Sequence, residues 1–378
     1  MSAEIILRQF GAKGPFLQEL VAYMERRISR GDLTDLTSLS LADEGFVNAW
    51  EHYVERTNNS LAIQVLSRVF PQLSFPIEAG ISKTAAYRDA TLKGAQVSSV
   101  DLQRSLVFEA PCDIELRLHQ TAAGSIPVII AENRNDFEFL VRAMSSRNEP
   151  VSVPQSMGAC LISGLNNWDR VGRFREQWEL KNPACSWREY FPEFVKNKTL
   201  YQDRVIVLSD GSYSNIESSQ LGLSEDCWRL MSRRIRLEHE CAHYLTLRFF
   251  GTMQNHLLDE TFADYAGICA VRKGVFRADW YLTFLGLDEN GDYRKGGRME
   301  NYFQEKPLAP ESFKVMLRLM VAIANNLETF SRTCDSSSLG ILCQLFAITG
   351  FRLDELADKS APKYLSDAYN NILSIVDH

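Results

Sequence analysis

Two histidines stand four residues apart in the stretch HECAH, residues 239–243, and a glutamate directly follows the first of them. Positions four apart lie on one face of an α-helix, so His239 and His243 can hold the same ion while Glu240 flanks them. Zinc chemistry needs this set: two neutral imidazole ligands, and a carboxylate that takes a proton from a water on the metal. The stretch therefore predicts a zinc site that still lacks a third protein ligand.

Two carboxylates further along the chain complete the predicted site. Glu260 follows His243 after sixteen residues, which leaves room for a turn at Gly251 and the start of a second helix. Asp264 lies four residues beyond Glu260 and so faces the same way. We expect Glu260 to be the third ligand, and Asp264 to accept a hydrogen bond from a ligand histidine and fix its orientation.

Other residues near the motif are interpreted as structural. Gly267 follows Asp264 and would let the two helices approach closely. Cys241 is offset by two from each histidine, so it points to the far side of the helix and is expected in the core. His256 is an alternative third ligand, but a loop or core position is the preferred interpretation.

The two motifs, HECAH and the later ETFAD, resemble the gluzincin pattern of zinc metallopeptidases, HExxH followed by ExxxD, over residues 236–268. The resemblance implies one zinc ion per chain, with His239, His243 and Glu260 as ligands. It implies Glu240 as the general base and Asp264 as the residue that orients a ligand. The implied activity is hydrolysis of a peptide bond in a peptide or protein substrate by a zinc-activated water.

A peptidase of this kind also needs a donor for the oxyanion that forms during the reaction. Side chains of suitable type follow the motif in the sequence, and the candidates are His256, Tyr265, Tyr281, Tyr293, Arg294 and Arg298. In zincin folds an edge strand beside the active helix aligns an extended peptide by main-chain pairing. The run RVIVLSDG, residues 204–211, is the last expected strand before the helix and could have this role.

A second function stays open beside the peptidase. The chain could be a catalytically inactive, zincin-like protein in which zinc is structural and the N-terminal region binds a partner or has a regulatory role. The coordination shell distinguishes the two, because a catalytic site keeps three protein ligands and an open position. A fourth protein ligand or a sealed pocket would indicate the structural role.

The elements that must position these residues can be bounded from local signals. Ser224 is a typical N-cap, Glu225 and Asp226 favour the positive end of a helix, and Gly251 is suited to its C-terminal end. The two histidines therefore lie well inside one long helix. Pro310 in a first-turn position predicts the start of another long helix, which continues to about residue 332.

The periodicity of the chain changes twice, which indicates three consecutive regions and an α+β fold. Residues 1–100 are mostly helical, residues 101–215 form a mixed sheet with intervening helices, and residues 216–378 form a helical, zincin-like region that carries the site. The boundary at 215 is soft, because the sheet and the active helix could belong to one domain. The expected strands are SLVFEA, IELRLHQ, IPVIIA, GACLISG and RVIVLSDG.

Composition limits the class of protein. The net charge of −7 and the few short basic clusters disfavour a nucleic-acid partner. No apolar run reaches the roughly 18 residues of a membrane span, and the N-terminus lacks the features of a signal peptide. Eight cysteines without a CxxC pair favour reduced thiols and a cytoplasmic location. Oligomeric state has no signature in the sequence.

Overall fold

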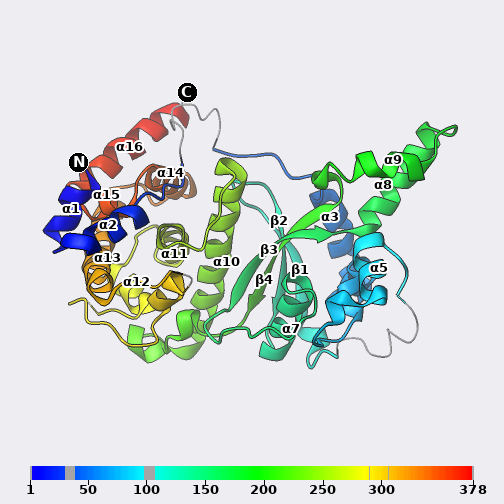
Figure 1. Cartoon of the computed structure of the whole chain (residues 1–378), viewed down its shortest axis with the longest axis horizontal. Coiled ribbons are helices and arrows are strands. Elements are labelled where there is room, and N and C mark those ends of the chain that lie inside the picture. Colours follow the sequence, from blue (N-terminus) through cyan, green and yellow to red (C-terminus); the bar gives the residue numbers. More distant parts are fainter. Residues whose placement is uncertain (1, 30–38, 98–106, 289, 305, 377–378) are drawn as a thin grey trace. The chain divides into compact units, whose positions relative to one another are not determined.

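The computed structural model describes residues 2–29, 39–97, 107–288, 290–304 and 306–376 (Figure 1). Its contacts divide the chain into two compact units. The sheet unit is Ala42–Gly211, and the helical unit combines Met1–Leu41 with Ser212–His378. A small mixed sheet and many helices give the α+β class that the sequence predicts.

The two units cut across the three consecutive regions expected from the sequence. The first helices contact helices near the C-terminus, because α1 (Ala3–Gln9) packs on α15 (Leu353–Ala357) and α2 (Gly14–Tyr23) on α13 (Pro310–Ser331). By contrast, α3 (Val47–Arg56) packs on the first strand and belongs to the sheet unit. The region predicted for residues 1–100 is therefore shared between the two units.

The sheet unit contains four strands in the order β1-β2-β4-β3, with β2 and β4 parallel and the other two pairs antiparallel. The strands are β1 (Ile114–His119), β2 (Ile126–Ala131), β3 (Ala159–Asn166) and β4 (Gln202–Ser209). β4 lies inside the sheet, and Ile206, Val207 and Leu208 are paired on both sides. The expectation that RVIVLSDG aligns a peptide as an edge strand is thus wrong, because its main chain is already paired.

The strand predicted for SLVFEA is also wrong in its described part, residues 107–110. The main-chain N–H groups of Glu109 and Ala110 donate to the carboxylate of Asp136 at 2.8 and 2.9 Å. These donors are therefore satisfied by a side chain and not by a neighbouring strand. Residues 105 and 106 lie outside the described part of the chain.

The helices of the sheet unit supply its core. Side chains of α3, α4 and α7 pack with one face of the sheet, and the largest of them, Trp50 and Tyr53, are fully buried. The α-helices of the sheet unit besides α3 are α4 (Ala62–Val69), α5 (Ala85–Lys93), α7 (Arg134–Ser145), α8 (Trp168–Lys181) and α9 (Trp187–Phe194).

The helical unit is built around α10 (Glu225–Phe250) and α11 (Leu257–Val271). Its other helices are α12 (Ala278–Leu285), α14 (Ser338–Thr349), α16 (Ala361–Val376) and the short 3-10 segments η7 (Tyr213–Asn215), η8 (Ser218–Leu221) and η9 (Arg298–Phe303). In the described parts of the chain, no helix combines the length and the apolar character that crossing a membrane requires.

The bounds of α10 follow the local signals in its sequence. The Ser224 side chain accepts a hydrogen bond from the Cys227 N–H, and Gly251 ends the helix in the left-handed conformation. α11 then packs closely on α10 at Gly267, where an added Cβ would stand 2.8 Å from the Ile235 carbonyl oxygen. Only glycine fits this contact, so the two helices approach closely, as the sequence predicts.

Candidate metal centre

Three side chains from α10 and α11 meet at one point. The Nε2 atoms of His239 and His243, both on α10, lie 3.1 Å apart. Glu260, on α11, brings Oε2 to 3.5 Å from His239 Nε2 and Oε1 to 3.4 Å from His243 Nε2. The packing of the two helices thus gathers all three predicted ligands.

The spacing of these atoms fits a tetrahedral metal ion. Zinc binds imidazole nitrogen and carboxylate oxygen at about 2.0–2.2 Å, so two ligands at a tetrahedral angle stand about 3.3 Å apart. The separations of 3.1, 3.4 and 3.5 Å bracket that value, and the last two end at different oxygens of Glu260. Among the described residues, no fourth His, Cys, Asp or Glu belongs to this group.

Asp264 sets the orientation of the first ligand histidine. Its Oδ1 atom lies 3.1 Å from His239 Nδ1, and the residue is fully buried. An ionised carboxylate only accepts hydrogen bonds, so Nδ1 carries the proton and the lone pair of Nε2 faces the other two ligands. The hydrogen bond expected for Asp264 is present, and its donor is His239.

Two further side chains hold Asp264. The Tyr213 hydroxyl donates to Asp264 Oδ1 and lies 3.0 Å from His239 Nδ1. Arg298 donates through Nη2 to Asp264 Oδ2, and through Nη1 to the Tyr213 hydroxyl at 3.0 Å. Both oxygens of the buried carboxylate are therefore fixed, and with them the ring of His239.

The turn that presents Tyr213 is conformationally unusual. Ser214 and Asn215 have φ angles of 51° and 57°, in the left-handed region that side chains seldom adopt. The Tyr213 N–H donates to Ser232 Oγ of α10 at 3.0 Å, and the Ser214 hydroxyl accepts from Arg298 Nη1 at 3.0 Å. These contacts hold the turn in a conformation that costs free energy, as is common where side chains must be placed accurately.

Glu260 is held as a carboxylate by its neighbours. Burial raises the pKa of its carboxyl group, but hydrogen bonds with His239 and His243 outweigh burial and hold this pKa well below its ordinary value. The Tyr302 hydroxyl donates to Glu260 Oε2 at 3.2 Å, and burial raises the pKa of this phenol well above its ordinary value. Tyr302 is therefore a neutral donor beside the third ligand.

Glu240 lies beside the ligands without joining them. It is buried on α10, between the two histidines in sequence, and is not one of the three clustered ligands. Burial raises the pKa of the Tyr213 phenol, Arg298 opposes the rise, and the carboxylates of Glu260 and Glu240 add to it. Both Glu260 and Glu240 thus contribute to the raised pKa of this phenol.

Most of the candidate oxyanion donors are engaged elsewhere. His256 is the N-cap of α11, since its Nδ1 accepts from the Leu258 N–H and its Nε2 lies 3.2 Å from the Tyr23 carbonyl oxygen. The hydroxyls of Tyr265, Tyr281 and Tyr293 bond to Gln344, Thr261 and the Gly297 carbonyl, and Arg294 is exposed. Of the six candidates, Arg298 is the one that hydrogen-bonds to Asp264 and Tyr213 beside His239.

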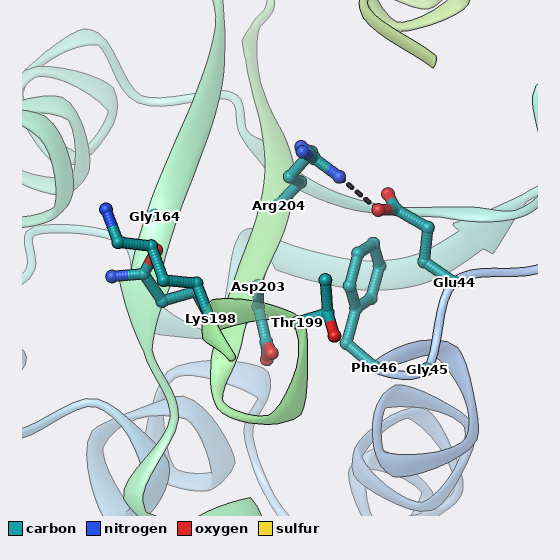
Figure 2. Close-up of a pocket in the computed structure, with 9 residues that line it drawn as sticks. Glu44, Gly45, Phe46, Gly164, Lys198, Thr199, Asp203 and Arg204 are labelled. Carbon is teal, nitrogen blue, oxygen red and sulfur yellow. Dashed lines mark hydrogen bonds and ion pairs between the residues drawn. The ribbon is translucent and has the colours of Figure 1, made fainter. Parts of the chain in front are cut away.

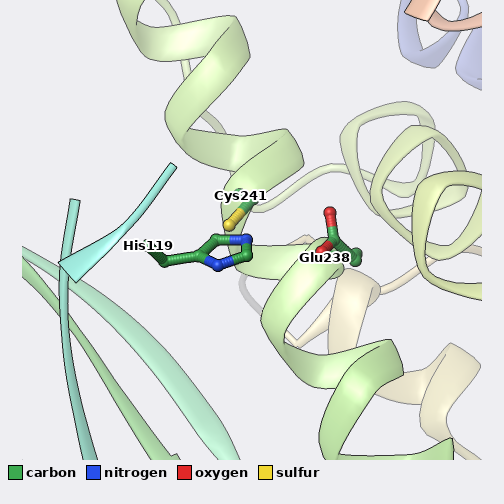
Figure 3. Close-up of side chains that lie close together, drawn as sticks. All are labelled: His119, Glu238 and Cys241. Atoms are coloured by element: carbon green, nitrogen blue, oxygen red, sulfur yellow. The ribbon is translucent and has the colours of Figure 1, made fainter. Parts of the chain in front are cut away.

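Two further side chains of α10 lie outside the group of His239, His243 and Glu260. Cys241 is buried, as the sequence predicts, and Figure 3 shows its side chain and that of Glu238 projecting from α10. Glu238 pairs with Arg234 one turn earlier, at 3.0 Å. On α3, His52 Nδ1 lies 3.5 Å from the carboxylate of Glu55, and both side chains are exposed.

The sheet unit contains a separate pocket of about 320 Å³ (Figure 2). Of its charged groups, Arg204 pairs with Glu44, and Asp203 pairs with Arg170 of α8. Burial raises the pKa of Asp203 against the opposing effect of Arg170, Asn167 and Trp50. These pairs stabilise the unit and leave the pocket without the convergent ligands of the metal centre.

Tyr213 and Tyr302 are the site residues that sequence reasoning missed. Tyr213 stands in SDGSYSN, a stretch with the composition of an ordinary turn, and Tyr302 stands in a loop region without periodicity. Neither has a fixed spacing from HECAH. One local signal in the sequence could have indicated Tyr213. It stands in a polar turn that precedes the HExxH helix, and a tyrosine there can reach the helix surface.

Comparison with known proteins gives a family. The family model described as "Family of unknown function (DUF7005)" matches residues 5–360. No curated protein and no solved structure matches the chain. A functional assignment must therefore come from the chemistry of the site.

Proposed function

We propose that this chain, which belongs to the DUF7005 family of unknown function, is a zinc-dependent metallopeptidase of gluzincin type. The observation that carries the proposal is the set of three separations among His239, His243 and Glu260, which match the ligand spacing of tetrahedral zinc. Imidazole and carboxylate donors suit zinc in particular. One zinc ion per chain is proposed.

The proposed roles are those that the resemblance to the gluzincin pattern implies. Bound zinc would polarise the scissile carbonyl and lower the pKa of a water molecule. Glu240 takes the proton of the attacking water and passes it to the leaving amine, as a general base and then acid. The Tyr302 hydroxyl donates to Glu260 Oε2 and so holds the carboxylate of the proposed third ligand.

The proposed substrate is an amide bond in a peptide or protein. Net charge −7 makes a nucleic-acid substrate a poor match for this surface. All eight cysteines are free, which supports the proposed cytoplasmic location. The internal position of β4 removes one way of aligning a substrate, so no strand is assigned that role.

The alternative is a zincin-like protein in which the metal has only a structural role. Two features favour the enzyme. The ligand set has three members among the described residues, whereas structural zinc sites generally have four protein ligands. The side chains of His239, His243 and Glu260 also keep 10, 9 and 17% of their surface exposed, so the site is not sealed.

Replacing the general base tests the proposal. Zinc-loaded protein should cleave a mixture of internally quenched peptides, and Glu240→Gln should reduce the rate by about 10²–10⁴-fold while zinc remains bound. Glu238→Gln, the same change on the same helix, is the matched control and should keep the wild-type rate. Cleavage that persists in Glu240→Gln would exclude this mechanism, and a zinc-loaded protein that cleaves no peptide would favour the structural role.

A further inference from the structure

Arg298 makes contacts that an oxyanion donor would not make. Its guanidinium group donates from Nη2 to Asp264 and from Nη1 to the hydroxyls of Tyr213 and Ser214. The side chain is only 11% exposed, so it is nearly buried beside the fully buried Asp264. Arg298 therefore contacts Asp264, which in turn contacts the proposed ligand His239.

The backbone around Arg298 is built to hold it there. At the neighbouring Gly297, an added Cβ would lie 2.8 Å from the Leu285 carbonyl oxygen and 2.9 Å from Gly286 Cα. The rings of Tyr293 and Phe303, on either side of this contact, both pack edge-on against Phe313 of α13. Residues 293–303 are thus anchored on each side of Arg298 to helices other than α10 and α11.

We infer that Arg298 is a positioning residue of the metal centre: with Tyr213 it holds Asp264 in the orientation that presents His239 Nε2 to zinc. This inference rests on the proposed zinc binding. The chain Arg298–Asp264–His239 makes residues 293–303 a third element of the site, beside α10 and α11. The HExxH and ExxxD motifs do not contain this element.

Removing Arg298 should weaken zinc binding. Asp264 would then be a buried carboxylate without its cation, a costly state that is relieved when the carboxylate turns away from His239. The guanidinium charge also repels a nearby cation, so its removal acts in the opposite direction. We expect the loss of orientation to dominate, because residues that orient zinc ligands typically contribute about 10–100-fold in affinity.

The test is the zinc dissociation constant, measured for zinc alone by competition with a chromophoric chelator. Arg298→Gln should weaken binding about 10–100-fold. The zinc dissociation constant of Arg298→Lys should lie between those of Arg298→Gln and wild type. An ammonium group can pair with Asp264 but cannot also reach Tyr213 and Ser214. Arg294→Gln removes an exposed charge from the same segment and is the matched control, with binding unchanged.

A second variant covers the case in which Arg298→Gln does not fold. Tyr213→Phe keeps the packing of the ring and removes only the hydroxyl that bonds Asp264, so it should weaken zinc binding roughly five-fold. Thermal unfolding of each chelated variant reports on the fold separately from metal affinity.

The outcomes separate the inference from the proposed function. Wild-type zinc binding with unchanged or tighter binding in both Arg298→Gln and Tyr213→Phe would overturn the inference alone. A wild-type chain that binds no zinc would overturn the proposed function and the inference together. Weaker binding in these variants, with Arg294→Gln at the wild-type value, would establish the role of Arg298.

Discussion

At the scale of single residues, the site separates ligands from the groups that orient them. His239, His243 and Glu260 present their atoms to one point, while Asp264 stands behind the first histidine. This division is what a metal centre requires, because a flexible imidazole loses affinity unless its second nitrogen is held. Glu240 lies outside both sets, and the role of proton carrier is proposed for it.

His256 gives a residue-scale prediction that is independent of catalysis. Burial lowers its pKa to about 4, and a protonated ring could no longer accept the Leu258 N–H at Nδ1 to cap α11. The unfolded chain therefore binds a proton near pH 6.5 that the folded chain binds only near pH 4. The folded state should lose about 2 kcal/mol from this residue between pH 7 and pH 5.

The variant His256→Asn tests this expectation, because asparagine also caps helices but does not titrate. The free energy of unfolding, measured by denaturant in chelated protein, should fall less steeply with decreasing pH in the variant than in wild type. Parallel curves between pH 7 and pH 5 would show that His256 is not held neutral by the fold.

At the scale of elements, the packing of two helices brings the residues of the site together. α10 and α11 pack closely through the Gly267 contact, and this packing brings the three predicted ligands together. Metal binding should therefore stabilise a structure that already exists and should not create it. We therefore expect the helical unit to stay folded without zinc, unlike small domains that unfold when the metal is removed.

Zinc removal tests the preformed helix pair. A chelator should lower the melting temperature while the helical circular dichroism signal at 25 °C is retained. At a free zinc concentration of 100 times Kd, the stabilisation lost is about 2.7 kcal/mol. A double variant, His239→Ala with His243→Ala, is the control and should not respond to chelator. Loss of the helical signal on chelation would show that the metal organises these helices.

Periodicity explains which parts of the site could be predicted from the sequence. The ligands, Glu240 and Asp264 all lie on two helices, where spacing of three or four residues translates directly into position in space. Arg298, Tyr213 and Tyr302 lie in turns and 3-10 segments without such a period, so only the fold brings them to the site. Arg298 was predicted by residue type, but its assigned role as an oxyanion donor does not fit its contacts.

At the scale of the whole molecule, long-range packing was the part that local patterns could not supply. The α+β class, the helix from residue 224 to 251 and four of the five strands followed from caps and alternation. The packing of Met1–Leu41 with the C-terminal helices could not be predicted in this way. An amphipathic pattern shows that a helix has an apolar face, but it does not identify the element that covers this face. The interior place of β4 was readable in hindsight from its continuous apolar run VIVL.

The central claim is that His239, His243 and Glu260 hold one zinc ion, and zinc K-edge X-ray absorption tests it most directly. Zinc-supplied, purified protein should contain one zinc per chain, with nitrogen and oxygen neighbours at about 2.0–2.1 Å and the outer scattering of imidazole. Protein without stoichiometric zinc, or zinc with sulfur neighbours at about 2.3 Å, would contradict the claim.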